Sequence, residues 1–178
     1  GVDIYSTMWD DTYAFRSGTS MSTPHVAGVA ALACSRFPNA SRDWVRFWLR
    51  YTADDLGDLG FDTCYGYGRI NARKAVEETP PDHDVLISSW EIPAYVETGG
   101  QAVVSTTVVN FGAADETDII VQLLVNGSLV NSTTIDTLAT RKSVTVNCSC
   151  IPTVKGASAL NRMRLLVSLG PVIENNVA

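Results

Sequence analysis

Two residues that could take part in covalent chemistry lie close together near the start of the sequence. Ser20 and His25 are five positions apart in the stretch SGTSMSTPH, residues 17–25. A serine hydroxyl becomes an effective nucleophile only when a base takes its proton and hydrogen-bond donors stabilise the oxyanion that forms. The first question is therefore whether His25 can be the base for Ser20.

The element that contains both residues answers this question. Residues 20–37 are rich in alanine, valine and glycine, which predicts a helix that is apolar on nearly all sides and buried in a larger protein. Five residues of a helix turn through about 500° and rise about 7.5 Å, so the two side chains point about 140° apart. His25 therefore cannot reach the hydroxyl of Ser20.

The local sequence leaves two interpretations of Ser20. Gly18 permits a tight turn before the helix, which places Ser20 where unpaired N–H groups and the positive end of the helix dipole converge. The N–H of Ser20 would then be one donor to an oxyanion. Alternatively, Ser20 is simply the N-cap of the helix.

The longer motif favours the nucleophile. GTSMSTPHVAG, residues 18–28, resembles the serine motif of the subtilisin-like proteases, with Ser22 in place of the usual alanine. We expect little consequence from this exchange of one small residue for another. GVDIYST at residues 1–7 and YGYGRINARKAV at residues 65–76 resemble flanking parts of the same catalytic domain. Met21, Pro24 and His25 favour this family over the related sedolisins.

The resemblance implies a role for each motif residue. Ser20 is the expected nucleophile, which forms an acyl-enzyme during peptide-bond hydrolysis, and His25 is an expected structural residue of the core. The family's catalytic Asp, catalytic His and oxyanion-hole Asn lie upstream of the serine motif, so we expect them N-terminal to Gly1 in a longer polypeptide. We therefore expect the 178-residue chain to be inactive by itself. No cofactor is evident, and the family's structural Ca²⁺ sites are expected elsewhere.

Three other polar residues have weaker functional interpretations. His83 lies in TPPDHD, residues 79–84, between Asp82 and Asp84. It is either a base or metal ligand, or a solvated linker histidine, and we favour the second. Asp10 and Asp11 lie in a predicted turn, and the polarity of a loop explains them.

Two further helices are expected before residue 79. Ser41 is a good N-cap for the first, whose sequence WVRFWLRY places Trp44, Val45, Trp48 and Leu49 on one side. The second is short and starts at Asn71. The segment between them, rich in glycine, is predicted to be turns.

The second half changes to the pattern of β-strands. Six β-branched runs separated by turn signals, at residues 84–92, 102–112, 118–127, 128–136, 142–151 and 161–169, predict a β-sandwich. DVLISSWEIP, VETGGQAVVSTTVVNFGAA and the ending VIENN resemble the Ig-like modules called CARDB. We expect Trp90 and Tyr95 to be buried, and we favour a spacer or stabilising cap over a specific binding role.

The expected fold class is therefore α/β, as the C-terminal portion of a subtilisin-like fold, followed by an all-β Ig-like sandwich. The expected domains are residues 1–79 for the peptidase portion, 80–84 for the linker and 85–178 for the sandwich.

Cysteine usage leaves the redox state partly open. Cys148 and Cys150 form a C-x-C that is too tight for a comfortable mutual disulfide in a strand. Cys34 and Cys64 either pair with each other or are free, buried thiols.

The net charge limits the possible partners of the protein, and its Asn-x-Ser/Thr triplets indicate where it is located. The net charge of −6 disfavours a nucleic-acid partner held by phosphate contacts, and no stretch has the length and hydrophobicity of a membrane span. Asn-x-Ser/Thr triplets at Asn39, Asn126, Asn131 and Asn147 hint at export. We expect an extracellular or cell-surface protein.

Two hypotheses of function follow. In the first, the chain is part of a secreted subtilisin-like serine endopeptidase that acts on proteins or peptides. In the second, it is a non-catalytic surface or adhesion module of a pseudo-protease. Asp, His and Asn motifs upstream of Gly1 would favour the enzyme.

The linker predicts that the sandwich folds independently. Pro80 and Pro81 cannot join a helix or a central strand, and the region beyond them holds enough apolar residues for its own core. We expect residues 84–178, expressed alone, to unfold cooperatively, to give a strand-type circular dichroism spectrum and to lack peptidase activity. An aggregated or unfolded product would contradict this division.

Overall fold

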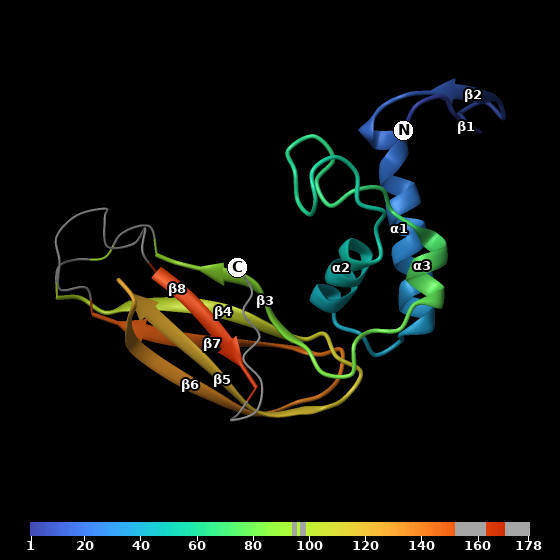
Figure 1. The fold of residues 1–178 in the computed structure, drawn as a ribbon. Helices are drawn as coiled ribbons and strands as arrows, with labels where there is room; N and C mark the ends of the chain where they lie inside the picture. The colour runs from blue at the N-terminus through green and yellow to red at the C-terminus, as the bar shows by residue number, and fades with distance from the viewer. Residues whose placement is uncertain (94–95, 97–98, 152–162, 170–178) are drawn as a thin grey trace. The chain divides into compact units, whose positions relative to one another are not determined.

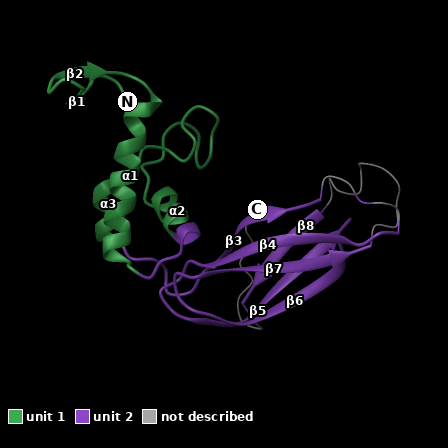
Figure 2. Cartoon of the chain, turned by 180° about the vertical axis from the view of Figure 1, so that it is seen from behind, with its two compact units in different colours: residues 1–38, 45–78 green, residues 39–44, 79–178 purple. Residues whose placement is uncertain are grey.

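The structure is a computed structural model that describes residues 1–93, 96, 99–151 and 163–169 (Figure 1). The chain forms two compact units (Figure 2). Residues 1–38 and 45–78 make up the first unit, and residues 39–44 and 79–178 make up the second.

The first unit consists of a β-hairpin and three helices. The hairpin pairs β1 (Ile4–Thr7) with β2 (Tyr13–Arg16) in antiparallel register, and its turn includes Asp10 and Asp11, both with positive φ. The helices are α1 (Thr19–Arg36), α2 (Arg42–Tyr51) and α3 (Ala72–Glu77). The three expected helices are therefore confirmed, and so is the turn at the two aspartates.

Trp48 holds the three helices together. Its ring is fully buried, and its Nε1 donates a hydrogen bond to the carbonyl oxygen of Ala75 in α3 at 2.9 Å. The ring of Phe37, just past the end of α1, meets Trp48 edge-on at 5.4 Å between centroids. One side chain of α2 thus contacts α3 and the end of α1, and α1 and α3 lie side by side (Figure 1).

The long helix α1 is covered on one side only. Val29 and Ala33 are its buried residues, whereas Val26 and Leu32 are exposed within the described part of the chain. The expected burial on nearly all sides is therefore not found here, because no described segment lies over the other faces.

A carboxylate closes the loop between α2 and α3. Asp54 accepts hydrogen bonds from Asn71 Nδ2 at 3.0 Å and Arg69 at 3.3 Å, and pairs with Lys74 Nζ at 3.0 Å. These donors, first Asn71 and then Lys74, lower the pKa of Asp54 from 3.8 to about 2. Asn71 also caps α3 by accepting from the N–H of Lys74. The ionised Asp54 thus fixes the glycine-rich loop to the start of α3.

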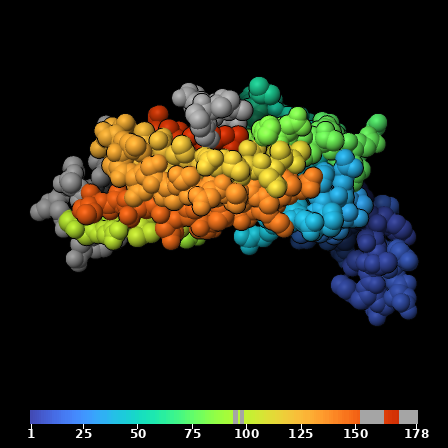
Figure 3. All heavy atoms as spheres, turned by 90° about the horizontal axis from the view of Figure 1, so that it is seen from below, coloured from blue at the N-terminus to red at the C-terminus, as the bar shows by residue number. Residues whose placement is uncertain are grey.

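The second unit is a sandwich of two three-stranded antiparallel sheets. One sheet has the order β3-β4-β7 and the other the order β6-β5-β8. The six expected strands are all present: β3 (Val85–Glu91), β4 (Ala102–Asn110), β5 (Glu116–Val125), β6 (Ser128–Leu138), β7 (Ser143–Cys150) and β8 (Met163–Ser168). In the space-filling view, the atoms of β6 and β7 form one continuous surface, in orange (Figure 3).

The sandwich core contains buried residues from all six strands. Val104, Val121 and Leu123 are fully buried in it. Trp90 was expected to be buried, but 46% of it is exposed because it lies near the end of the edge strand β3. Tyr95 and the ending VIENN lie outside the described residues.

The cysteines follow the expectations in part. Cys148 and Cys150 are free and buried, as expected from their close spacing on β7. Cys34 and Cys64 are also free, but both are exposed. The expectation of a disulfide or of buried thiols for this pair was wrong, because neither thiol lies beneath a described segment.

The second unit also contains the start of α2. Ser41 caps the helix by accepting from the N–H of Trp44 at 3.2 Å, as expected. Trp44 is fully buried, and its Nε1 donates to the carbonyl oxygen of Phe111 at 3.2 Å. Because residues 39–44 group with the sandwich, the two units are not consecutive along the sequence.

His83 has a specific partner in this unit. Its Nδ1 lies 3.0 Å from Oε1 of Glu116, whose carboxyl group is buried. Burial raises the pKa of the neighbouring Asp84, and the charge of Glu116 raises it further. His83 is exposed, as expected of a solvated linker histidine, and the contact with Glu116 was not predicted.

The position of Trp48 predicts a large effect on stability. We expect Trp48→Ala to lower the free energy of unfolding of the first unit by about 3–5 kcal/mol, through the cavity and the lost hydrogen bond. Urea unfolding followed by the helical circular dichroism signal measures this. Trp9→Ala is the matched control, because Trp9 is 75% exposed and should change stability by no more than about 0.5 kcal/mol. Equal effects of the two substitutions would contradict the central role of Trp48.

Candidate active site

The serine motif lies on a strand–turn–helix junction. Gly18 connects β2 to α1 with φ 150° and ψ 168°, which is a conformation that residues with a Cβ atom rarely adopt. Its N–H donates to the carbonyl oxygen of Gly1 at 2.8 Å, and its own carbonyl oxygen accepts from the nitrogen of Gly1 at 2.8 Å. This pairing holds the turn against the residue that precedes β1.

Ser20 is the second residue of α1. The helix begins at Thr19, and its N-cap is Gly18. The alternative that Ser20 is the N-cap was therefore wrong. Ser20 is exposed, and no hydrogen bond joins its hydroxyl or its backbone N–H to any described residue. Its N–H is one of the unpaired donors of a helix start, close to the positive end of the helix dipole.

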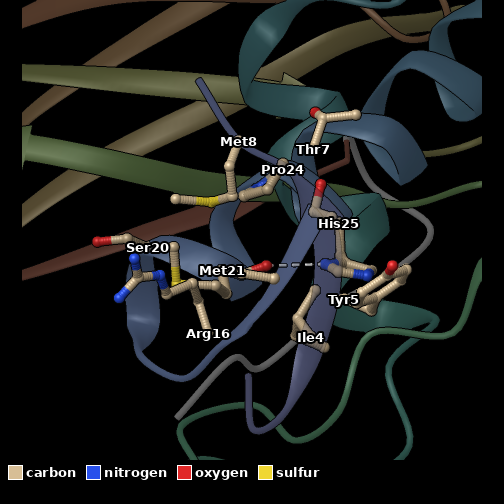
Figure 4. Close-up of a pocket in the computed structure, with 11 residues that line it drawn as sticks. Ile4, Tyr5, Thr7, Met8, Arg16, Ser20, Met21, Pro24 and His25 are labelled. Carbon is tan, nitrogen blue, oxygen red and sulfur yellow. Dashed lines mark hydrogen bonds between the residues drawn. The ribbon is translucent and has the colours of Figure 1, made fainter. Parts of the chain in front are cut away.

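An open hollow of about 380 Å³ adjoins this serine (Figure 4). Residues of β1, β2 and the first turns of α1 line it, among them Ile4, Ala14, Arg16, Ser20, Met21 and His25. Most of the other lining side chains are apolar or hydroxylic. The serine hydroxyl therefore borders a space that an extended ligand could enter.

His25 does not interact with Ser20. Its Nδ1 lies 2.9 Å from the carbonyl oxygen of Met21 in the preceding turn, and the two side chains point in different directions (Figure 4). The geometry expected from the helix period is confirmed. His25 was also expected in the core, but it is exposed here, because no described segment covers this face of α1.

One residue of the site was missed from the sequence. Arg16 was not considered, yet it lines the same hollow as Ser20. The alternation of side chains along β2 would have placed it on the same face as Ala14.

Two kinds of feature are absent from the part of the chain that the structure describes. No group of three His, Cys, Asp or Glu residues is arranged to hold a metal ion there. Among the same residues, no helix combines the length and the hydrophobicity needed to cross a bilayer.

Comparison with protein families accounts for both halves. Residues 3–68 match the model of the subtilase family, and residues 81–164 match the CARDB model. The chain joins part of a subtilase domain to a CARDB domain. Its subtilase segment is homologous to the C-terminal part of the catalytic domain of subtilisin-type serine proteases, and its second half is a sheet-rich, Ig-like CARDB domain, as expected.

Individual relatives cover the two segments separately. The subtilase segment is 50% identical over 77 residues to thermitase of Thermoactinomyces vulgaris, a match that spans 43% of this chain and 26% of thermitase. It is 48% identical over 64 residues to an extracellular serine protease of Serratia marcescens, covering 36% of this chain and 6% of that protein. The solution structure of a CARDB domain from Pyrococcus furiosus aligns with 21% identity and a TM-score of 0.42, covering 55% of this chain and 86% of that domain.

The chain thus spans about a quarter or less of the length of these proteases. The comparisons identify the family of the subtilase segment, and they leave the role of Ser20 a prediction.

The conformation of Gly18 yields a test with a matched control. We expect Gly18→Ala to lower the free energy of unfolding by about 1–3 kcal/mol, because the backbone is strained while the added methyl group meets only ordinary contacts, with Met21 Sδ at 3.9 Å. Gly28→Ala adds the same methyl group inside α1, also in open space, and should leave stability unchanged or raise it by up to about 1 kcal/mol. Denaturant unfolding of the 178-residue chain compares the two variants. A harmless Gly18→Ala would show that the turn is not strained.

Proposed function

We propose that the subtilase segment supplies Ser20 as the nucleophile of a serine endopeptidase that cleaves proteins or peptides. The observation that carries this proposal is the exposed Ser20 hydroxyl at the helix start, within GTSMSTPHVAG and beside the hollow. Homology to subtilisin-type serine proteases supports it.

Each group has a defined task in this proposal. Ser20 Oγ attacks the scissile carbonyl carbon, and the base takes the hydroxyl proton as the C–O bond forms. The carbonyl oxygen becomes an oxyanion, which the N–H of Ser20 stabilises as one of its donors. The tetrahedral intermediate then expels the amine, which receives the proton from the base, and leaves an acyl-enzyme that water hydrolyses.

The base must come from another part of the protein. The side chain of His25 points away from Ser20, and its Nδ1 is hydrogen-bonded to the carbonyl oxygen of Met21, so His25 cannot take the proton of the Ser20 hydroxyl. We propose that the catalytic Asp and His, and an oxyanion-hole Asn, belong to a longer polypeptide N-terminal to Gly1. The partners of this chain are then its protein or peptide substrates and the remaining part of the peptidase domain. The proposed role of Ser20 requires no cofactor bound to this chain.

We also propose an extracellular or cell-surface location. The name of the Serratia relative, an extracellular serine protease, supports this, as do the Asn-x-Ser/Thr triplets. The CARDB domain would serve as a spacer or stabilising cap.

A fluorophosphonate probe tests the nucleophile directly. In the longer protein, we expect the probe to label Ser20 alone and Ser20→Ala to lower kcat by at least about 10⁴-fold without a change in melting temperature. Ser35→Ala is the matched control, because Ser35 is an exposed serine at the other end of α1. The 178-residue chain by itself should not hydrolyse casein, since a serine without a base gains little reactivity.

The same experiment separates the two hypotheses of function. A folded longer protein that neither reacts with the probe nor cleaves peptides would favour the non-catalytic surface module. Hydrolysis by the 178-residue chain alone, lost in Ser20→Ala, would contradict the assignment of the base to another segment.

A further inference from the structure

The pairing of the hairpin strands places the side chain of Arg16 at the hollow beside Ser20. In the register of β1 and β2, Ile4 lies opposite Arg16, and Ser6 lies opposite Ala14. Alternate residues of a strand share a face. These two pairs therefore occupy one face of the hairpin, and all four residues line the hollow.

The other face of the hairpin is aromatic. The ring of Tyr5 lies 5.6 Å from that of Tyr13 and 4.8 Å from that of Phe15, between centroids. Strand alternation places Arg16 on the face opposite this cluster, and Arg16 lines the same hollow as Ser20, as Tyr5 also does.

Arg16 has no counter-charge in the described part of the chain. No carboxylate lies within 4.0 Å of its guanidinium among those residues, and no acidic residue lines the hollow. The Asp3 carboxylate, next to Ile4, instead accepts from the hydroxyl of Ser17 at 3.4 Å. In the same unit Arg73 pairs with Glu77 and Lys74 with Asp54, whereas Arg46, which does not line the hollow, forms no ion pair with a described residue either.

We infer that Arg16 selects substrates with an acidic side chain close to the scissile bond. This inference rests on the proposed function, because it takes Ser20 as the point where the bond is cut. A guanidinium forms paired hydrogen bonds with a carboxylate and keeps its charge at all physiological pH values. An extended substrate advances about 3.3 Å per residue, so a side chain that shares the hollow with Ser20 reaches about two residues from the scissile bond.

The inferred contact is exposed, which sets the size of its effect. An exposed ion pair changes binding by a few-fold, and salt screens it. We therefore expect a preference of about three- to fivefold in kcat/KM for Glu over the uncharged Gln, at one position within two residues of the bond and at low ionic strength. The preference should shrink as salt is added.

Matched peptides and charge variants of the longer protein test this. The peptides carry Glu, Gln or Lys at each of the two positions on either side of the cleaved bond. Arg16→Ala should abolish the preference for Glu, Arg16→Lys should retain part of it, and Arg16→Glu should shift it to Lys. Arg46→Ala is the matched control, because Arg46 is an exposed arginine of the same unit that does not line the hollow.

Fluorophosphonate labelling separates this inference from the proposed function. The uncharged probe should label Ser20 at the same rate in the wild-type protein and in Arg16→Ala, which also shows that the variant is folded. If Ser20 is not labelled, the proposed function is wrong and the role of Arg16 is overturned with it. If Ser20 is labelled but Glu is not preferred, or the preference survives in Arg16→Ala and Arg16→Glu, only the role of Arg16 is overturned.

Discussion

Gly18 has to hold a backbone conformation that residues with a Cβ atom rarely adopt, and the geometry of the site depends on it. The turn converts a strand into a helix within two residues, so Arg16 ends β2 and Thr19 begins α1. Because Gly18 itself is the N-cap, the hydroxyl and the N–H of Ser20 have no hydrogen-bond partner among the residues that the structure describes. If Ser20 capped the helix, its hydroxyl oxygen would instead accept a hydrogen bond from a backbone N–H.

The remainder of the subtilase segment keeps this helix in place. Trp48 contacts Phe37 at the end of α1 and donates to Ala75 of α3, while the Asp54 carboxylate fixes the long loop to α3. The contact with Phe37 lies at the C-terminal end of α1. At the N-terminal end, Gly18 pairs with Gly1 through the backbone.

Much of the architecture could be predicted because its signals are local. The strands of the sandwich follow from runs of β-branched residues, and α2 begins after Ser41 because that hydroxyl caps it. The separation of His25 from Ser20 follows from the period of a helix alone. What could not be predicted involves partners far apart in the sequence: His83 with Glu116, Trp44 with Phe111, and Gly1 with Gly18.

The sequence by itself predicts a nucleophilic role for Ser20 and determined that His25 cannot assist it, because an eleven-residue motif and a helical period depend only on neighbours along the chain. Only the tertiary structure decided that Gly18 caps the helix, that Arg16 shares the hollow with Ser20, and that Cys34 and Cys64 are exposed. These features depend on which segments cover a given face, and that is set by contacts between residues distant in sequence. Strand alternation alone gives the face of β2 on which Arg16 lies. Only the placement of α1 beside that face brings Arg16 to the same hollow as Ser20.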